Sequence, residues 1–408
     1  MELKKMIKGN NSTSKHPMEI GILEIRRHLP ILYTFSRICK TNNTNVTIFT
    51  TKELYLRLET YLTEKDKKNY DIILKEDNET FRSFVKRVET ICDKKIDVLF
   101  VNTIHETFLD IVCYLGFKPK SNTILVIHHV NAWLKQRLIF NIKHPIRTAD
   151  TNLSSMLIHI FILNKFDAIN VIYQPLKEYI RANTNYEKKI FTLPTSIFEN
   201  AKTIKRQENE EKLKIVIPGL IQKHRKDYGA VFPVFEALFK HHKEKIKLYV
   251  PGLPVGKFGR QIYKKFKDME QKGCDVEIFD HFVPDDTFYD ILIQSDIILA
   301  PIRIKTRADG DIEEIYGKTV GSGVVFNAIQ YAKPIIVPAE FNMLPELESS
   351  TLKYSDSIEL EHIMTELILY PEKLRELKRE ALINSKKFSL KNLQHYFEKN
   401  ILTWLCGR

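Results

Sequence analysis

Short apolar runs that alternate with longer amphipathic segments are the feature of this 408-residue sequence that most constrains its fold. Strand patterns that alternate with helix patterns at this spacing are typical of parallel, doubly wound sheets. The pattern occurs in two blocks. The strands predicted in the first block are 20–25, 46–49, 72–74, 97–101, 123–127, 168–172 and 190–192, and those in the second block are 213–217, 246–250, 276–279, 297–300 and 335–337.

The charged segment Glu199–Lys212, which is almost free of apolar residues, separates the two blocks. The sequence therefore predicts an α/β protein of two Rossmann-like, doubly wound domains, 19–204 and 205–390, after a flexible leader over 1–18. The tail is helical in pattern, and its last amphipathic piece must bury its apolar face against another part of the chain. We expect this piece, 391–408, to pack back onto the first domain.

Composition narrows the range of partners. The formal net charge of +12 favours an anionic ligand such as a nucleotide or an anionic lipid surface. Nucleic acid is not an expected partner, because no basic run is interleaved with aromatic residues. No apolar run is long enough to span a bilayer, and the polar amino terminus lacks the apolar core of a signal peptide, which predicts a cytoplasmic protein. The five scattered cysteines indicate neither a disulfide framework nor a zinc site.

A glycine-rich turn that opens a helix lies in the second block. Gly321-Ser322-Gly323 precede an apolar helical run, and Lys333-Pro334 end this run before the strand 335–337. Backbone N–H groups at the start of such a helix bind phosphate or diphosphate, and Lys318 and the Ser322 hydroxyl can add hydrogen bonds. The spacing is neither that of a Walker loop nor that of a dinucleotide fingerprint, so a plain tight turn with a serine cap is the alternative.

Polar residues follow many of the predicted strands. Because ligands of open parallel sheets bind at the carboxyl ends of the strands, these residues are candidates for a site. We expect two rows of them to face each other across an interdomain cleft. The first row contains His105, His128 and His129, and the second contains Gly219, Arg225 and His281. Capping and packing roles for His128 and His129, and a local ion pair between Arg225 and Asp227, are the alternatives.

Together these segments resemble the GT-B glycosyltransferases, two-domain enzymes that move a sugar from a nucleotide donor. Within that group the chain is most similar to bacterial enzymes that build capsular, exopolysaccharide or lipopolysaccharide chains, with a carboxyl domain like that of glycosyltransferase family 4. The resemblance implies two Rossmann-like domains that face each other across a cleft, and a C-terminal helix that crosses back. It rests on IPGLIQKHRKDY at 217–228, FDHFVPDDTFYDILIQSDIILAPI at 279–302, YGKTVGSGVVFNAIQYAKPIIVP at 316–338 and the bent tail.

By this resemblance the second domain would bind the nucleoside diphosphate. Gly219 and Arg225 would lie beside the diphosphate or sugar, and Lys318, Ser322 and Gly323 would hold the phosphates. His281, Phe282 and Val283 would lie near the base or its sugar. In one respect the chain departs from the best-known retaining branch, whose two glutamates correspond to Thr319 and Asn327 here. Glu313 or Glu314 would then have to bind the ribose, which leaves the donor and the stereochemical outcome open.

The implied chemistry needs few groups. Lys318, Arg225 and the helix N-terminus would stabilise the leaving diphosphate. An inverting reaction also requires a general base, for which His129 or His128 is the first choice and His105 the second. No Asp-x-Asp motif follows a predicted strand, so we expect no obligatory metal and no cofactor, the nucleotide sugar being a substrate.

Two other functions are compatible with the sequence: a sugar-nucleotide epimerase of the same architecture, and a non-catalytic GT-B-like subunit that binds a nucleotide sugar or a partner enzyme. A transferase of bacterial surface polysaccharide synthesis would take a saccharide or lipid-linked acceptor, which predicts a peripheral contact with the inner membrane face. The expected contact is the helical stretch 131–164, and an ordinary amphipathic helix is the alternative. Its apolar residues Trp133, Leu134, Leu138, Ile139 and Phe140 lie beside Lys135, Arg137, Lys143 and Arg147.

Overall fold

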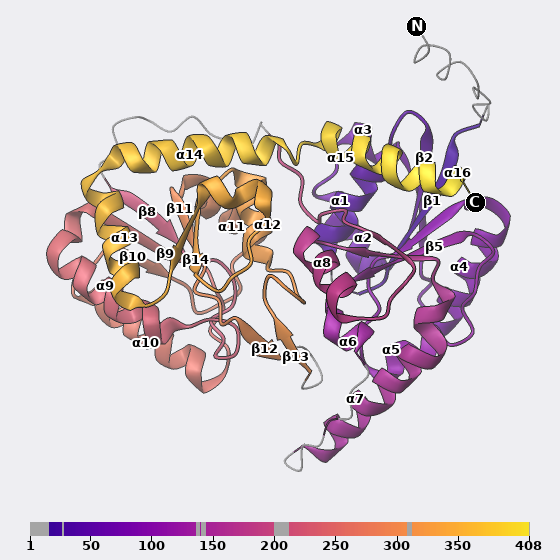
Figure 1. Cartoon of the computed structure of the whole chain (residues 1–408), viewed down its shortest axis with the longest axis horizontal. Helices are drawn as coiled ribbons and strands as arrows, with labels where there is room; N and C mark the ends of the chain where they lie inside the picture. Colours follow the sequence, from indigo (N-terminus) through magenta and orange to yellow (C-terminus); the bar gives the residue numbers. More distant parts are fainter. Residues whose placement is uncertain are drawn as a thin grey trace, which may run out of the picture.

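A computed structural model of the chain describes residues 16–26, 28–135, 139, 144–199, 212–307 and 312–407. It contains two α/β domains, each built on a parallel sheet with helices packed against it (Figure 1). The strand orders are β3-β2-β1-β4-β5-β6-β7 in the first sheet and β10-β9-β8-β11-β14-β15 in the second. The α/β fold predicted from the sequence is thereby confirmed. The predicted boundary at 204/205 and residues 1–15 of the predicted leader lie outside the described residues.

All seven strands predicted for the first block are present, each within two residues of its expected ends. The strands are β1 (Met18–Glu24), β2 (Thr44–Thr50), β3 (Tyr70–Leu74), β4 (Val98–Val101), β5 (Asn122–Ile127), β6 (Ala168–Val171) and β7 (Lys189–Phe191). The helices are α1 (Leu29–Cys39), α2 (Lys52–Glu59), α3 (Glu64–Lys67), α4 (Phe81–Lys95), α5 (Phe108–Cys113), α6 (Val130–Leu134), α7 (Pro145–Leu157) and α8 (Gln174–Asn183). A π-turn (Ile158–Ile162) and a 3-10 turn (Leu163–Lys165) continue α7.

The second domain also contains its five predicted strands. They are β8 (Leu213–Val216), β9 (Ile246–Val250), β10 (Val276–Ile278), β11 (Ile297–Leu299) and β14 (Ile335–Pro338). The helices are α9 (Tyr228–His242), α10 (Gly256–Gln271), α11 (Asp285–Gln294), α12 (Gly323–Tyr331), α13 (Ser357–Leu369) and α14 (Pro371–Lys386), with 3-10 turns at Lys243–Lys245 and Pro345–Ser350.

Three short strands were not predicted. β15 (Thr351–Tyr354) forms one edge of the second sheet, and β12 (Lys305–Arg307) pairs antiparallel with β13 (Glu313–Ile315) in a separate hairpin. Each strand of the hairpin has one buried residue, and β15 buries only its last. Strands this short and this exposed lack the continuous apolar run that marks a strand buried on both faces, such as β4.

The carboxyl-terminal helices cross from the second domain to the first (Figure 1). Beyond α14, the chain continues over the first domain as α15 (Leu390–Tyr396), a π-turn (Phe397–Leu402) and α16 (Thr403–Cys406). Gln394 Nε2 donates to the carbonyl oxygens of Arg37 and Lys40 at the end of α1. The fully buried ring of Phe397 packs against Phe100 of β4, so the tail completes the core of the first domain.

We expect Phe397→Ala to lower the free energy of unfolding by about 3–5 kcal/mol, because truncation of a fully buried phenylalanine leaves a cavity. Urea denaturation measures this loss. Lys399→Ala changes an exposed residue of the same π-turn and serves as the control. A loss below about 1 kcal/mol in Phe397→Ala would show that the tail is not part of the core.

Candidate active site

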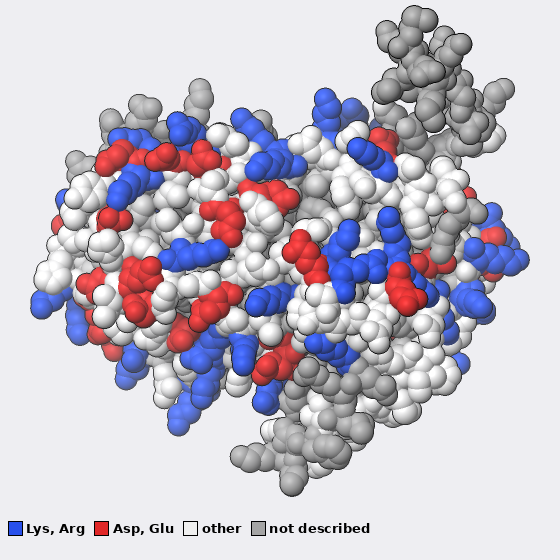
Figure 2. All heavy atoms as spheres, in the orientation of Figure 1, with Lys and Arg blue, Asp and Glu red and all other residues white. Residues whose placement is uncertain are grey.

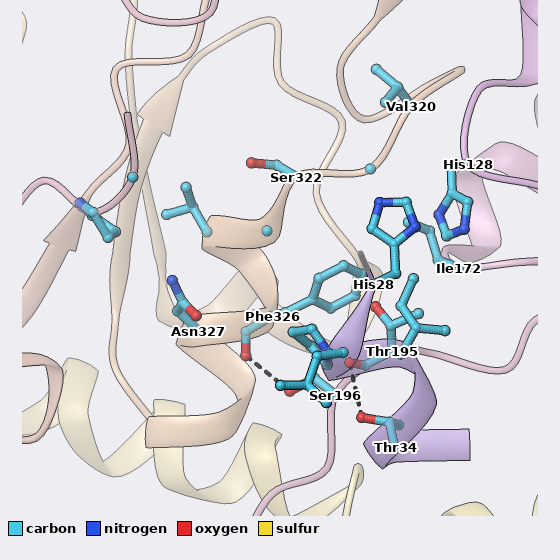
Figure 3. A pocket seen from close by; sticks show the side chains of 18 of the residues that line it. His28, Thr34, His128, Ile172, Thr195, Ser196, Val320, Ser322, Phe326 and Asn327 are labelled. Carbon is cyan, nitrogen blue, oxygen red and sulfur yellow. Dashed lines mark hydrogen bonds between the residues drawn. The ribbon is translucent and has the colours of Figure 1, made fainter. Parts of the chain in front are cut away.

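A cavity of about 680 Å³ lies between the two domains, a size typical of ligand sites. Loops at the carboxyl ends of both sheets form its walls (Figure 3). The first-domain wall includes His28, Thr103, His105, Glu106, His128 and His129, and the second-domain wall includes Gly219, Arg225, Lys226, Arg307, Ser322, Gly323, Val324 and Asn327.

The position of the cavity follows from the strand orders. The chain reverses its direction of winding between β1 and β4 in the first sheet, and between β8 and β11 in the second. Loops on either side of such a reversal run to opposite faces of the sheet and leave a crevice between them. His28 follows β1 and Thr103 follows β4, while Gly219 follows β8, so these residues line the two crevices.

A chain of hydrogen bonds leads from the interior of the first domain to the cavity. Thr103 Oγ1 donates to Glu24 Oε2 over 2.6 Å, and His28 Nδ1 lies 2.7 Å from the same hydroxyl oxygen. Glu24, the last residue of β1, is fully buried. The His28 ring lies 4.8 Å from the ring of His128 and 6.1 Å from that of His105, measured between centroids. The structure therefore gathers three imidazoles at one wall.

Burial dominates the titration of this cluster. Loss of solvent raises the pKa of Glu24 to about 7, even though Thr103 and the backbone N–H of Arg26 donate to its carboxylate. Burial, together with the neighbouring histidines, lowers the pKa of His28 to about 3. The pKa of His128 falls to about 4 for the same reason. Both imidazoles are therefore neutral at physiological pH.

The N-terminus of α12 forms the opposite wall. The first N–H groups of a helix have no acceptor within it, and in α12 these belong to Gly323 and Val324, which line the cavity. A Cβ atom placed on Gly323 would meet no atom within 4 Å, so this end of the helix is open. The exposed side chains of Arg225 and Arg307 line the same cavity. Neither forms an ion pair with any residue that the structure describes.

The fold of the whole chain matches several solved structures. The sucrose-phosphate synthase of Thermosynechococcus elongatus has a TM-score of 0.61 and 11% sequence identity, over 96% of this chain and 100% of that one. The UDP-GlcNAc 2-epimerase of Neisseria meningitidis, bound to UDP-GlcNAc, has a TM-score of 0.54 and 14% identity, over 95% and 100%. The chain has the GT-B fold. No family model and no curated protein sequence matches it.

Seven of the site residues expected from the sequence line the GT-B cleft: His105, His128, His129, Gly219, Arg225, Ser322 and Gly323. His128 Nε2 lies 2.9 Å from the carbonyl oxygen of Asn102, so this nitrogen carries the proton. His129 Nδ1 lies 3.3 Å from Glu106 Oε1. Trp133 Nε1 donates to the same carboxylate oxygen over 2.8 Å.

Lys318 does not reach the cleft. The backbone N–H of Thr319 donates to Ile315, and that of Gly317 donates to Val320, which closes a tight turn with Lys318 exposed on it. The positive φ of 79° at Gly317 suits glycine in this turn. This turn comes directly after β13, and the β12–β13 hairpin was not predicted from the sequence. The phosphate-binding role expected for Lys318 therefore has no support in the geometry.

Glu314 is not available to a ribose either. It is fully buried, and its carboxylate accepts from the backbone N–H groups of Asn131 (3.3 Å) and Ala132 (2.9 Å) in α6. Burial raises the pKa of Glu314 to about 7, although these hydrogen bonds and that of Thr319 act against the rise. Of the two positions where the retaining branch has glutamates, Thr319 is buried and Asn327 lines the cleft (Figure 3). Glu314 joins the domains instead of contacting a ligand.

Three residues expected near the base, His281, Phe282 and Val283, also do not line the cavity. They follow β10, which forms the edge of the second sheet opposite to β15 and lies two strands away from the reversal at β8 and β11. His281 pairs with Asp280 at the surface over 2.8 Å. Phe282 is 68% exposed, and Val283 is buried. The sequence pattern places these residues directly after a strand, as observed, but the pattern does not show the order of the strands in the sheet.

The cavity residues that the sequence analysis did not select include His28, Thr103, Glu106, Lys226 and Arg307. The buried Lys226 donates to the carbonyl oxygens of Pro218 and Gly219, the latter over 2.7 Å, and burial lowers its pKa to about 7. Gly219 has φ at 89°, a conformation that glycine adopts without strain. The signal for His28 was its place directly after the first strand.

The turn before α12 is packed against the first domain. The backbone N–H of Ser322 donates to the Tyr173 hydroxyl (3.2 Å), which in turn donates to the Ser322 carbonyl oxygen (2.6 Å). A Cβ atom on Gly321 would lie 2.5 Å from both Ile172 Cδ1 and Tyr173 Cε2, so only glycine permits this approach. Ser196 Oγ adds a hydrogen bond to the carbonyl oxygen of Phe326 (Figure 3).

We expect Tyr173→Phe to lower the free energy of unfolding by about 1–3 kcal/mol, because two buried backbone groups of Ser322 lose their partner. Chemical denaturation measures the change. Tyr263→Phe is the matched control, since in the described part of the chain no hydrogen bond joins the Tyr263 hydroxyl to another residue. Equal stability of Tyr173→Phe and the control would contradict the role given to this hydroxyl.

Proposed function

We propose that this chain is a glycosyltransferase that moves a sugar from a nucleotide-sugar donor to a saccharide or lipid-linked saccharide acceptor. The cavity between the domains carries this proposal, because its two walls have complementary chemistry. One wall has arginines and a helix N-terminus, and the other has neutral imidazoles. Two solved structures of similar fold contain related ligands: MnaA of S. aureus with UDP, and the Neisseria meningitidis epimerase with UDP-GlcNAc.

The second-domain wall suits the diphosphate of the donor. The N–H groups of Gly323 and Val324 present the positive end of the α12 dipole to the cavity. Arg225 and Arg307 can form charge-assisted hydrogen bonds to phosphate oxygens. As the bond to the sugar breaks, negative charge grows on the diphosphate, and fixed positive groups at this place stabilise the transition state.

We expect Arg225→Ala and Arg307→Ala each to weaken the binding of a nucleoside diphosphate about tenfold, which is about 1.4 kcal/mol. Titration calorimetry with UDP, GDP and ADP, with and without magnesium, measures the affinity and identifies the base. Lys318→Ala should leave the affinity unchanged, because its side chain lies outside the cavity.

Arg303→Ala is the matched control for the two arginines. Arg303 is exposed, pairs with Asp227 and does not line the cavity. An equal loss of affinity in Arg303→Ala would mean that the nucleotide senses only the general positive charge of the domain. No binding of any nucleotide by the unaltered chain would overturn the proposed donor site.

Activity is tested by incubating the chain with nucleotide sugars and a panel of saccharide acceptors. Release of nucleoside diphosphate that depends on the acceptor supports the transferase. The second candidate is an epimerase, which is favoured by the similarity of fold to several UDP-GlcNAc 2-epimerases. In D₂O without an acceptor, an epimerase would convert the donor and incorporate deuterium. Tight binding without either reaction would indicate a non-catalytic subunit. Independence from added metal stays a prediction, and turnover in EDTA tests it.

We also propose that α7 contacts a membrane surface, where lipid-linked acceptors lie. This helix projects from the first domain (Figure 1). It has exposed apolar residues at positions that share one face. They are Ile146, Leu153 and Met156, with Ile160 and Phe161 in the π-turn that follows. On the face shown in Figure 2, acidic and basic side chains are interspersed over both domains, so the apolar residues would supply most of the binding.

The residues expected to make this contact are only partly placed as predicted. Trp133 is buried and its indole N–H donates to Glu106, so it belongs to the core and not to a membrane contact. Leu138, Phe140, Arg137 and Lys143 lie outside the described residues. No helix in the described ranges combines the length and apolar character that a bilayer crossing needs.

The double variant Ile146→Ser/Ile160→Ser should reduce co-flotation with anionic phospholipid vesicles several-fold, because it removes apolar surface from the exposed face of α7 and its π-turn. Leu56→Ser is the control, since Leu56 is 54% exposed on α2 of the same domain. If the unaltered chain does not float with the vesicles, the membrane contact is wrong.

A further inference from the structure

The buried carboxylate of Glu24 has no evident structural purpose. Its oxygens accept from the backbone N–H of Arg26 (2.8 Å) and from the Thr103 hydroxyl (2.6 Å). The guanidinium of Arg26 pairs with Asp110 instead, so no charged hydrogen bond neutralises Glu24 among the described residues. A carboxyl group in such a place is expensive to ionise. Its hydrogen bonds, however, lead through Thr103 to an imidazole at the cavity.

The ionisation of Glu24 determines which nitrogen of His28 carries the proton. The Thr103 hydroxyl has a single hydrogen. When Glu24 is ionised, Thr103 donates to it, and the hydroxyl oxygen must accept from His28 Nδ1–H. His28 Nε2 then has a free lone pair. When Glu24 is protonated, both donations reverse, and the proton of His28 moves to Nε2. The three groups form a relay that exposes a base only when Glu24 is charged.

His28 Nε2 is available to a ligand. The ring lines the cavity (Figure 3), and Thr103 is hydrogen-bonded to the other ring nitrogen, Nδ1. Within the described residues, Nε2 forms no hydrogen bond. The titratable groups that face the His28 ring are His105, His128, His129 and Glu106. Those that face Glu24 are Arg26 and Tyr114, and of these only Arg26 is cationic.

We propose that His28 is the general base of the transfer and that Thr103 and Glu24 hold it in the Nδ1–H tautomer. The transfer then inverts the configuration at the anomeric carbon of the sugar. This inference rests on the proposed function and adds a mechanism to it. The acceptor O–H gives its proton to His28 Nε2, and its oxygen forms a bond to the anomeric carbon. The bond from that carbon to the diphosphate oxygen breaks, and its electron pair leaves with the diphosphate.

We infer inversion because the proposed base and the proposed diphosphate site lie on opposite walls of the cavity. His28 belongs to the first-domain wall, and the arginines and α12 belong to the second-domain wall. An acceptor that is deprotonated at the first wall approaches the sugar from the side opposite to the leaving diphosphate. The imidazolium that forms keeps its Nδ1–H bond to Thr103, and the Glu24 carboxylate behind Thr103 stabilises its charge.

Variants of the relay test the proposal by kinetics. His28→Gln should lower kcat by about 10²–10⁴-fold, while the affinity for the nucleoside diphosphate stays unchanged and shows that the site is folded. Thr103→Val should lower kcat, and Thr103→Ser, which keeps a hydroxyl, should restore most of it. In the unaltered enzyme kcat should rise with pH and level off above about 7, where Glu24 is ionised. Glu24→Gln should abolish this rise.

A full kcat in Thr103→Val, or retention of configuration at the transferred carbon in the product NMR spectrum, would overturn the proposal. The relay also has a readout that does not need turnover. In ¹⁵N-histidine spectra the His28 signal, assigned by its loss in His28→Gln, should show the Nδ1–H tautomer at pH 8 and the Nε2–H tautomer at pH 6. Absence of this change refutes the relay. Absence of sugar transfer together with the tautomer change would refute the proposed function alone.

Discussion

The contact between residues 313–326 and the first domain is the constraint on which the cleft depends. Glu314 accepts two backbone N–H groups of α6, and the Tyr173 hydroxyl bridges the N–H and C=O groups of Ser322. The same segment leads directly into α12, so the contact that joins the domains also aims the helix N-terminus at the cavity. Gly321 permits this contact because no side chain fits between it and Tyr173.

Two buried glutamates show how similar groups take different roles. Glu24 and Glu314 both lose their solvent, and burial raises the pKa of each to about 7. The hydrogen bonds of Glu314 end at the backbone of the other domain, where they satisfy the first N–H groups of α6 and hold two parts of the chain together. Those of Glu24 continue through Thr103 to an imidazole at the cavity wall. The groups at the far end of each hydrogen-bond chain, and not the carboxyl group itself, determine whether the glutamate holds the domains together or belongs to the proposed relay.

Much of the site could be expected from the sequence because strand ends are local features. His105, His128, His129, Gly219 and Arg225 each follow an apolar run, and all of them line the cavity. Lys318 lies outside the cavity, on the tight turn that follows β13. Hairpins with one buried residue per strand leave little trace in a sequence, so this turn was not expected. His281 was misplaced because β10 lies at the edge of its sheet.

By itself, the sequence determined that this chain forms two blocks of alternating strands and helices, because the periodicity of apolar residues dictates which segments can bury a face. It also determined which polar residues lie at strand ends. Only the tertiary structure decided which of those ends meet. Strand order arises from packing between segments far apart in the chain, and this packing placed His28 beside Thr103 and put the α12 N-terminus across the cavity from them. Residues 75 positions apart can form one relay only when β1 and β4 become neighbours.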